Sequence, residues 1–274
     1  MASRWTMVIV RGLAAAAICA GIMSAAPGPV RADSLFSGDW SLSLGAAVFT
    51  APDYEGGRRY LLRAAPIISL GRQGTITKFS SRNDNISLAF IDTGSFRAGA
   101  TGKILFGRDG SDSRDLAGLD RVEWGAEAGG FAEFYPTDWL RLRGEVRHGI
   151  RSHNGIVADF AADAFVDVTP TVRISGGPRL EIASGNYFDA YYGVTPAEAA
   201  ASGLTAYDPG GGIASYGIGG AVTWKTTDKL TTSLLGEYSR LAGPAADSSL
   251  VRERGSKNQF LLGVSASYRF DFSL

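Results

Sequence analysis

The chain lacks the residues on which many metal and nucleophile sites depend. Of its 274 residues only one is cysteine, Cys19, and only two are histidine, His148 and His153. Cys19 lies in the N-terminal leader described next, and Ile18 before it does not fit a lipoprotein cleavage site, so the rest of the chain has no thiol. Neither histidine has carboxylates or thiolates at metal-ligand spacing. We therefore expect no metal and no cofactor.

Long apolar runs are missing too, since none approaches the roughly twenty residues of a spanning helix. The N-terminus instead has the pattern of an export signal, with Arg4 and Arg11 before an apolar core over residues 12–26. We predict that residues 1–32 are a cleaved signal peptide and that residues 33–274 form a single domain. Cleavage removes three arginines and leaves 24 basic against 27 acidic residues, which argues against nucleic acid as a partner.

What the chain has in place of these features is a period-two alternation of apolar and polar residues. In Asn258–Phe270 the even positions are apolar and the odd positions are mostly small or polar. Similar segments recur from Trp40 onward, and twelve result if two weaker ones near Thr75–Ser80 and Asn85–Ile91 are counted. One such strand also fits a soluble sandwich. The repetition favours a lipid-facing sheet, which has to close on itself to satisfy its backbone groups.

The connections between these segments alternate in length. Short gaps such as Pro136–Asp138 and Thr226–Asp228 take turns with long ones such as Gly107–Asp120 and Gly185–Ala214. Short turns on one rim and long loops on the other are typical of bacterial outer-membrane barrels. The predicted fold is all-β: a closed antiparallel transmembrane β-barrel of about 12 strands, with short periplasmic turns and long extracellular loops.

If the apolar face meets lipid, the opposite face lines the lumen and carries charges of both signs. One interpretation is a cross-strand network that satisfies buried charge and fills the bore. The other is a selective pore in which the Arg141–Arg147 row faces the Asp159–Asp167 row. A narrow barrel favours the first. The predicted lumen charge network consists of Arg97, Lys103, Glu123, Glu127, Arg141, Arg143, Glu145, Arg147, Asp159, Asp163, Asp167, Arg173, Arg179, Glu181 and Glu237.

Aromatic residues gather near the predicted strand ends, as in the interface belts of membrane proteins. This set comprises Trp40, Tyr60, Trp124, Phe134, Tyr135, Trp139, Trp224, Tyr268 and Phe270.

The two histidines raise the question of catalysis. His148 falls on the predicted lipid face near the outer rim, where outer-membrane phospholipases place a His–Ser pair. Ser152 has the opposite parity, however, and no other serine lies beside His148. His153 belongs to a Ser-His-Asn-Gly turn, for which we predict a surface position. We therefore predict that the protein is not an enzyme.

The longest connection carries a helix signal. Thr195 followed by Pro196 fits an N-cap with proline at the first helical position, and Gly203 fits a helix end. The aromatic residues Tyr187, Tyr191 and Tyr192 precede this helix, and we expect them to fold over the mouth of the barrel.

The amino-acid sequences of the loops resemble those of the MltA-interacting protein / OmpV family. The stretches that carry the likeness are YFDAYYGVTPAEAAASGLTAY (187–207), LAGPAADSSLVRERGSKNQ (241–259), the Pro52-Asp53-Tyr54-Glu55-Gly56 run and the terminal Tyr268-Arg269-Phe270. The family-motif loop residues are Tyr187, Tyr191, Tyr192, Gly193, Pro196, Gly203 and Tyr207.

The resemblance implies an outer-membrane barrel that contacts lipid and the barrel assembly machinery. For some members it also implies a scaffold between a lytic transglycosylase and a murein synthase, and for others a role in osmotic adaptation or adhesion. It transfers no catalytic residues. Family members tend to stop at the aromatic of Tyr-Arg-Phe, whereas here four residues follow, so the assembly aromatic beside Tyr268 is either Phe270 or Phe272.

Overall fold

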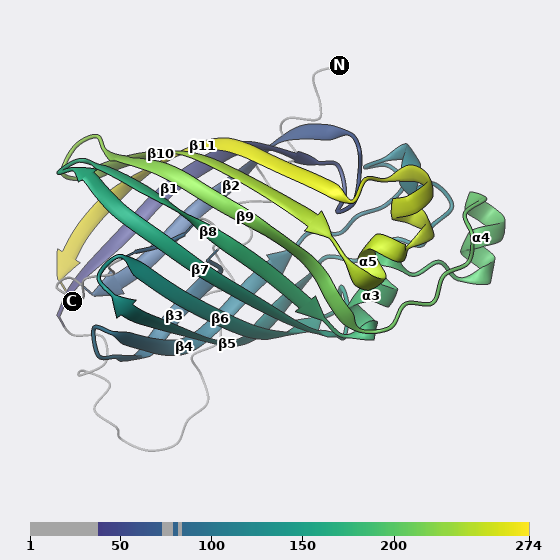
Figure 1. Cartoon of the computed structure of the whole chain (residues 1–274), viewed down its shortest axis with the longest axis horizontal. Coiled ribbons are helices and arrows are strands. Elements are labelled where there is room, and N and C mark those ends of the chain that lie inside the picture. Colours follow the sequence, from purple (N-terminus) through teal and green to yellow (C-terminus); the bar gives the residue numbers. More distant parts are fainter. Residues whose placement is uncertain (1–37, 73–78, 82–83, 274) are drawn as a thin grey trace.

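The computed structural model describes residues 38–72, 79–81 and 84–273. Within these ranges the chain forms one sheet of eleven strands and three short α-helices (Figure 1). The helices are α3 (Gly185–Tyr192), α4 (Pro196–Ser202) and α5 (Gly243–Asp247). The strands are β1 (Asp39–Pro52), β2 (Tyr60–Arg72), β3 (Ile86–Asp92), β4 (Phe96–Leu105), β5 (Gly125–Thr137), β6 (Leu140–Ile150), β7 (Ile156–Thr169), β8 (Val172–Ala183), β9 (Gly212–Lys225), β10 (Leu230–Leu241) and β11 (Asn258–Ser273).

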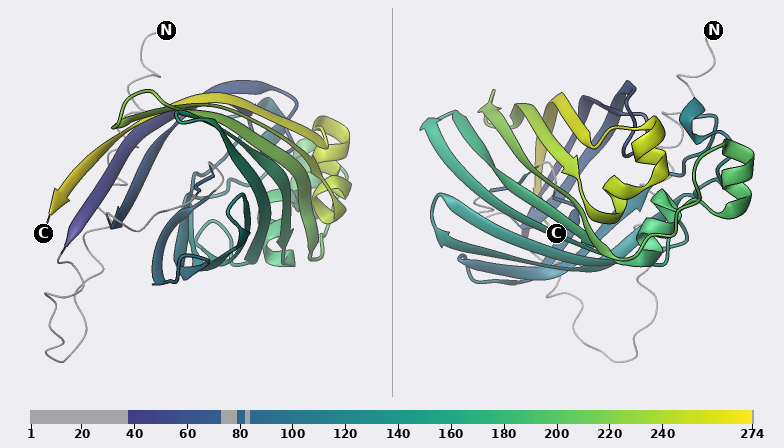
Figure 2. Two further views of the ribbon diagram at one scale, coloured as in Figure 1. Left: turned by 60° about the vertical axis from the view of Figure 1, so that its left-hand side comes forward. Right: turned by 45° about the vertical axis from the view of Figure 1, so that its right-hand side comes forward.

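The sheet is curled into a half-barrel in which neighbouring strands run antiparallel. Its order is β2-β1-β11-β10-β9-β8-β7-β6-β5-β4-β3, so the first and last strands of the chain pair with each other. In this register Val48 lies opposite Val264 and Leu44 lies opposite Tyr268. Figure 2 shows the strong curvature, with β2 and β3 as the two edges of the described sheet.

The prediction of a closed barrel with about twelve strands is confirmed only in part. Eleven strands are seen in the described ranges, and their order leaves β2 and β3 without a ladder between them. The expected strand near Thr75–Ser80 lies mostly outside the described residues, and 79–81 are not in a strand. The weak segment near Asn85–Ile91 does form a strand, β3.

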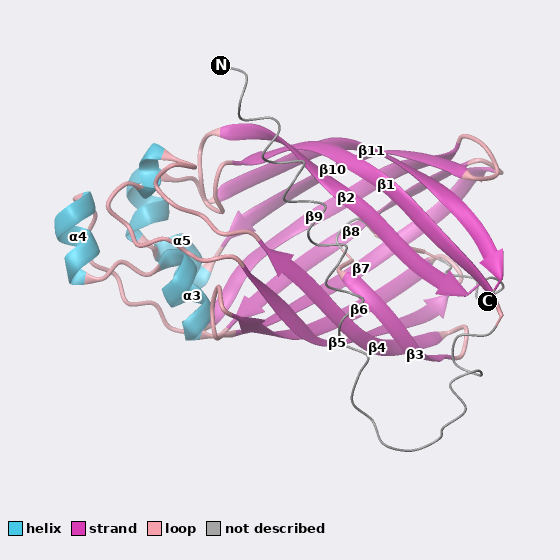
Figure 3. Ribbon diagram, turned by 180° about the vertical axis from the view of Figure 1, so that it is seen from behind, coloured by secondary structure: helices cyan, strands magenta, loops and turns pink. Residues whose placement is uncertain are grey.

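The two ends of the sheet differ as the connection lengths predict. Residues 93–95, 138–139, 170–171 and 226–229 make short turns at one end. The long connections and all three helices gather at the other end, and the C-terminus lies at the short-turn end (Figure 3). Strands of 7 to 16 residues thus run between a compact rim and a rim covered by loops.

The outer face of the sheet is apolar. Leu142, Phe160 and Val264 are 43%, 46% and 56% exposed, which places them on the outside rather than in a shared core. A soluble sandwich would bury such residues, since burial of apolar area is what stabilises its fold. The alternation therefore reflects an apolar exterior and a polar interior.

Three apolar or aromatic residues depart from this pattern. Val122 is buried because it lies before β5, in an isolated bridge with Arg108. Trp40 and Tyr135, predicted in the aromatic belts, are buried as well. Tyr135 points inward and contacts Glu133 and Phe165, because its odd position in β5 selects the lumen face. The other belt residues are exposed near strand ends.

Candidate functional site

Two inward-facing walls have different chemistry. The charged wall is the inner face of β4 to β8, which holds the arginines and carboxylates. The small-residue wall is the inner face of β9, β10, β11 and β1, where glycine, alanine, serine and threonine prevail, as in the hydroxyl pair Thr223–Ser233 at 3.0 Å. Of the predicted network only Glu237 belongs to the small-residue wall, beside Gly219.

Arg141 on β6 is the centre of the charged wall and is 0% exposed. Its Nη1 and Nη2 atoms donate to the two oxygens of Asp84 at 2.7 and 2.8 Å. Nη2 also donates to Asp163 Oδ2 at 2.6 Å, and Arg179 binds the other oxygen of Asp163. A bidentate pair plus a second carboxylate satisfies the guanidinium, which is what permits its burial.

Arg143 and Arg147 extend this network toward the loop end. Arg143 pairs with Glu133 and donates from Nε to Glu145 Oε1 at 2.7 Å. Arg147 donates to Glu127 at 2.7 Å and to Glu145 at 2.8 Å, and it also pairs with Asp159. Successive inward positions of β6 are two residues apart, so one strand supplies three arginines to the same row.

His153 is buried within this network, so its predicted surface position is wrong. Its Nε2 atom lies 3.1 Å from Glu127 Oε1, and the Gly155 N–H donates to its Nδ1 at 3.1 Å. Because Nδ1 accepts, the neutral ring carries its proton on Nε2 and donates it to Glu127. The turn after β6 folds inward because the charged wall offers this acceptor. His148, by contrast, is exposed on the outer face.

Part of the connection between β2 and β3 lies inside the sheet and packs on the charged wall. The Phe79 ring stacks on Phe165 at 4.8 Å, and the Arg141 guanidinium lies 4.7 Å above it. Asp84 binds Arg141, and Asn85 donates to Glu145 at 2.8 Å. Sequence analysis missed these partners, because an Asn-Asp-Asn run is typical of a turn. The three inward arginines of β6 were a signal in the sequence that could have indicated these partners, since buried arginines need carboxylates nearby.

The other predicted lumen charges lie in different settings. Arg97 pairs with Glu133 and Asp92, and Arg173 pairs with Asp167 near the short turns. Lys103 lies within electrostatic range of Glu127, Asp159 and Glu181, and no described carboxylate forms an ion pair with it.

Glu123 is a correction to the predicted network. It lies before β5 and pairs with Arg121 and Arg151 at the outer rim, so it is not in the lumen. Period-two alternation in the sequence already begins at Arg121 and therefore predicts an inward Glu123, but the strand itself begins only at Gly125.

The loops form a cap over the end of the charged wall. Tyr187, Phe188 and Tyr192 of α3 are buried in a cluster with Leu241 and Val251. The Tyr187 hydroxyl lies 3.0 Å from Glu55 Oε2 and 3.4 Å from Glu181 Oε1. Burial raises the pKa of Tyr187, and these two carboxylates raise it further, so the hydroxyl stays protonated and donates.

The remaining loop residues of the family motif fix the path of the chain. Tyr191 stacks under the Arg108 guanidinium at 5.3 Å, and Gly193 ends α3. Pro196 opens α4 behind the Thr195 cap, and Gly203 ends it with φ +79°, a left-handed conformation that favours glycine. Tyr207 donates to the Pro244 carbonyl at 3.0 Å.

The terminal strand β11 continues through Ser273. Tyr268 and Phe270 are exposed on the outer face, and Phe272 lies opposite Trp40 of β1.

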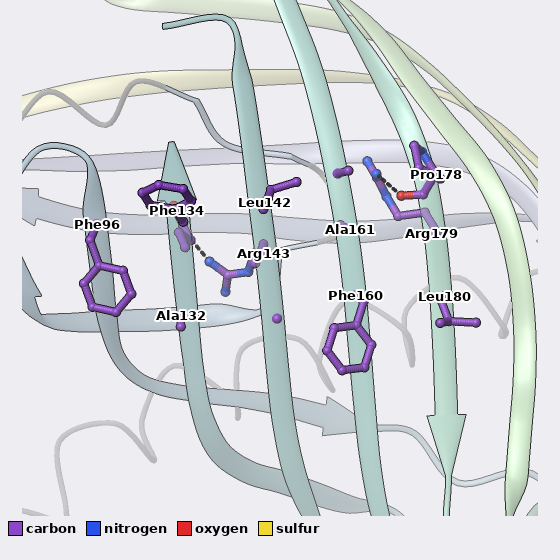
Figure 4. A pocket seen from close by; sticks show the side chains of 13 residues that line it. Phe96, Ala132, Phe134, Leu142, Arg143, Phe160, Ala161, Pro178, Arg179 and Leu180 are labelled. Atoms are coloured by element: carbon purple, nitrogen blue, oxygen red, sulfur yellow. Dashed lines mark hydrogen bonds and ion pairs between the residues drawn. The ribbon is translucent and has the colours of Figure 1, made fainter. Parts of the chain in front are cut away.

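The outer face carries a shallow apolar groove of about 510 Å³ over β4 to β8. Its walls include the rings of Phe96, Phe134 and Phe160 (Figure 4). The small residues Ala132, Gly144 and Ala162 also line it and form its floor. Arg143 and Arg179 reach it only through the backbone of the sheet, since their side chains belong to the inner face (Figure 4).

In the described part of the chain, no group of three or more histidine, cysteine or acidic side chains is arranged to hold a metal ion. No helix in those ranges has the length and apolarity needed to cross a bilayer.

An apolar exterior, a charged interior and antiparallel neighbours define the class of the outer-membrane β-barrel fold. Within that class the chain belongs to the family described as MltA-interacting protein MipA, whose model matches residues 44–270. The match confirms the resemblance drawn from the loops. No curated protein matches the chain.

Solved structures of outer-membrane proteins are similar at low identity. Neisserial surface protein A is 10% identical over 85% of this chain and 99% of its own, with a TM-score of 0.27. A Pseudomonas aeruginosa FadL homologue is 9% identical over 85% of this chain and 90% of its own, with a TM-score of 0.36. The attachment invasion locus protein Ail of Yersinia pestis is 10% identical over 86% of this chain and 100% of its own, with a TM-score of 0.22.

Proposed function

We propose that this chain is a non-enzymatic outer-membrane protein that docks murein-remodelling enzymes at the periplasmic face of the membrane. Its apolar exterior supports placement in a bilayer, and the loop-covered rim then faces outward. The family to which the chain belongs is named for interaction with MltA, a lytic transglycosylase, and that name suggests the partner class.

The observation that carries this proposal is the state of the charged wall. Arg141 is 0% exposed and Arg147 is 1% exposed, and each is bound by two or more carboxylates. Charges held by fixed partners in this way stiffen a structure and give little to a permeating ion. This supports the structural interpretation of the lumen charges over a pore.

A docking role has to use the short-turn rim, because that rim faces the periplasm. The turn 226–229 exposes Asp228 and Lys229, and the neighbouring turn carries the half-exposed Asp167–Arg173 pair. Mixed exposed charge of this kind selects partners and sets association rates more than affinity.

The test is capture of a purified lytic transglycosylase by the protein in nanodiscs. Exchanging the charges of one turn, Asp228→Lys with Lys229→Glu, is expected to lower capture about tenfold, because register-specific charge pairs reverse. The matched control exchanges Arg114→Glu with Asp120→Lys on the opposite rim and should leave capture unchanged. Absence of capture by the unaltered protein would refute the docking role.

The small-residue wall favours a second candidate, a narrow pore. Its short side chains line the bore opposite the charged wall, and a solute path would follow them. Planar-bilayer recording separates the two functions. Conductance that changes with Arg143→Ala, together with no enzyme capture, would establish the pore.

An enzymatic role has less support. His148 lies opposite Ala128 and Ile156 in the sheet, and neither neighbour supplies a nucleophile. We expect His148→Ala to leave the membrane lipid composition unchanged; altered lipid acylation would revive a lipid-modifying activity.

A further inference from the structure

Two of the strands that line the apolar groove, β5 and β6, lead to a basic cluster at the loop-covered rim. The floor of the groove at Ala132 and Gly144 belongs to β5 and β6, which are register partners at this point. Trp124 directly precedes β5 and Arg151 directly follows β6. The same pair of hydrogen-bonded strands therefore carries the groove at Ala132 and Gly144 and, at its loop-covered end, the Arg151 cation.

Arg151 is held on the outside of the sheet. It is the one non-glycine residue with positive φ in the described ranges, at 77°, a strained conformation that persists where the surroundings impose it. Its guanidinium lies 4.2 Å from the Trp124 ring, and its side chain is 50% exposed. The strain thus turns this cation toward the membrane side, stacked on an interface aromatic.

Arg151 has a second arginine nearby. Glu123 pairs with both Arg121 and Arg151, so the rim cluster has two cations and one anion and keeps a net charge of about +1. Arg121 is the more exposed of the two, with 67% of its side chain accessible. On the outer face of β6, His148 is followed by Ile150, the residue directly before Arg151. Paired guanidinium groups are suited to phosphate oxygens.

The spacing matches one leaflet. Gly144 and Arg151 are seven residues apart, about 23 Å along an extended strand. With the usual barrel tilt of about 40° this is roughly 18 Å of depth, close to half of a hydrocarbon core plus its interface. A chain that hangs from a headgroup at Arg151 therefore reaches the groove at Gly144.

We propose that this outer face binds a phosphorylated, multi-chain glycolipid of the outer leaflet, lipid A, with a phosphate on Arg151 and Arg121 and an acyl chain in the groove. The proposal rests on the proposed outer-membrane placement, which puts the loop-covered rim in that leaflet. The cationic rim selects an anionic amphiphile over a second copy, since a copy would bring the same positive charge. At the end of the groove nearer this rim, the Phe160 ring and the small residues Ala132 and Gly144 suit the end of a flexible hydrocarbon chain.

The protein is inserted into nanodiscs of phosphatidylethanolamine that contain either lipid A or phosphatidylglycerol. It is then purified from them, and the amount of lipid A or phosphatidylglycerol that stays bound to it is measured. Arg121→Gln with Arg151→Gln is expected to reduce lipid A retention about tenfold. Gly144→Leu, which fills the groove, is expected to reduce it as well. Arg240→Gln, an exposed residue near the same rim on β10, and Ala266→Leu on the outer face of β11 are the matched controls and should retain lipid A as the unaltered protein does.

The outcomes separate this proposal from the one it rests on. Insertion is read from the heat-dependent shift in gel mobility of folded barrels. A chain that does not insert overturns both proposals. A chain that inserts but retains lipid A equally with and without the rim arginines overturns the lipid site alone. Equal retention of phosphatidylglycerol, or a cross-linked dimer abolished by Gly144→Leu, also overturns it.

Discussion

The charged wall and the small-residue wall face the same lumen but are held together differently. On β6, Arg141, Arg143 and Arg147 bind carboxylates from β5, β7 and the segment before β3. On β9 to β11 and β1, hydroxyl pairs and close backbone contacts take their place, as at Thr223–Ser233. The comparison teaches that a barrel interior can be specified by ion pairs on one side and by small volume on the other.

The largest expected effect is on stability when the centre of the charged wall is removed. Arg141→Ala leaves the carboxylates of Asp84 and Asp163 buried without their main partner, so we expect a loss of about 3–5 kcal/mol in the free energy of unfolding. Urea unfolding in lipid vesicles, followed by tryptophan fluorescence, measures it. Ser233→Ala on the small-residue wall is the control, with a change within about 0.5 kcal/mol. Equal losses would erase the distinction between the walls.

Coupling between partners sharpens the comparison. A double-mutant cycle of Glu133→Ala and Arg143→Ala is expected to give an interaction energy of about 1–3 kcal/mol, because the two groups are buried and in contact. The matched cycle of Thr223→Val and Ser233→Ala is expected below about 1 kcal/mol. Unfolding midpoints of the four proteins in each cycle provide the values. A larger interaction energy for the Thr223–Ser233 pair than for the Glu133–Arg143 pair would contradict the conclusion that ion pairs hold the charged wall more strongly than hydroxyl pairs hold the small-residue wall.

One contact between the cap and the charged wall is made by the Tyr187 hydroxyl, which lies beside Glu181 of β8 and Glu55. Tyr187→Phe removes the donor to Glu55 and leaves the two carboxylates without it, so we expect α3 to lose about 1–2 kcal/mol of local stability. Hydrogen exchange of the α3 amides should rise while that of β6 stays constant. Tyr216→Phe, on the outer face of β9, is the control. Unchanged exchange in α3 would show that the aromatic cluster alone holds the cap.

The smallest effect concerns α4, which is remote from both walls. Burial raises the pKa of Glu198, but hydrogen bonds from the Asp120 and Thr195 N–H groups outweigh it and hold the pKa below the ordinary 4.5. A lowered folded pKa means that this stabilisation is complete above pH 4.5 and is lost as pH falls through the folded value. We expect about 1 kcal/mol at pH 7 from the capping box.

The contribution of the capping box is measured by comparing the helix content of α4 in the Thr195→Ala variant and in the unaltered chain, at neutral and at acidic pH. The difference should shrink on acidification. In Glu198→Gln the pH dependence should disappear, and a persistent dependence there would assign it to another group.

Particular residues show how far sequence reasoning reached. Period-two alternation predicted the outward Leu142, Phe160 and Val264, because side chains of a strand alternate between faces whatever the partner strand is. Local capping rules predicted Thr195, Pro196 and Gly203 at the ends of α4, because these effects act within one helical turn. The amino-acid sequences of the loops predicted membership of the MltA-interacting protein family.

The sequence by itself determined which residues face lipid and which face the lumen, since that depends on parity along one strand. Only the tertiary structure decided which charged side chains pair with each other. The Arg141–Asp84 pair joins residues 57 apart, and it exists because the curled sheet encloses the segment before β3. His153 turned inward and Glu123 outward for the same reason: burial beside a partner depends on register and curvature, which arise from contacts between distant strands.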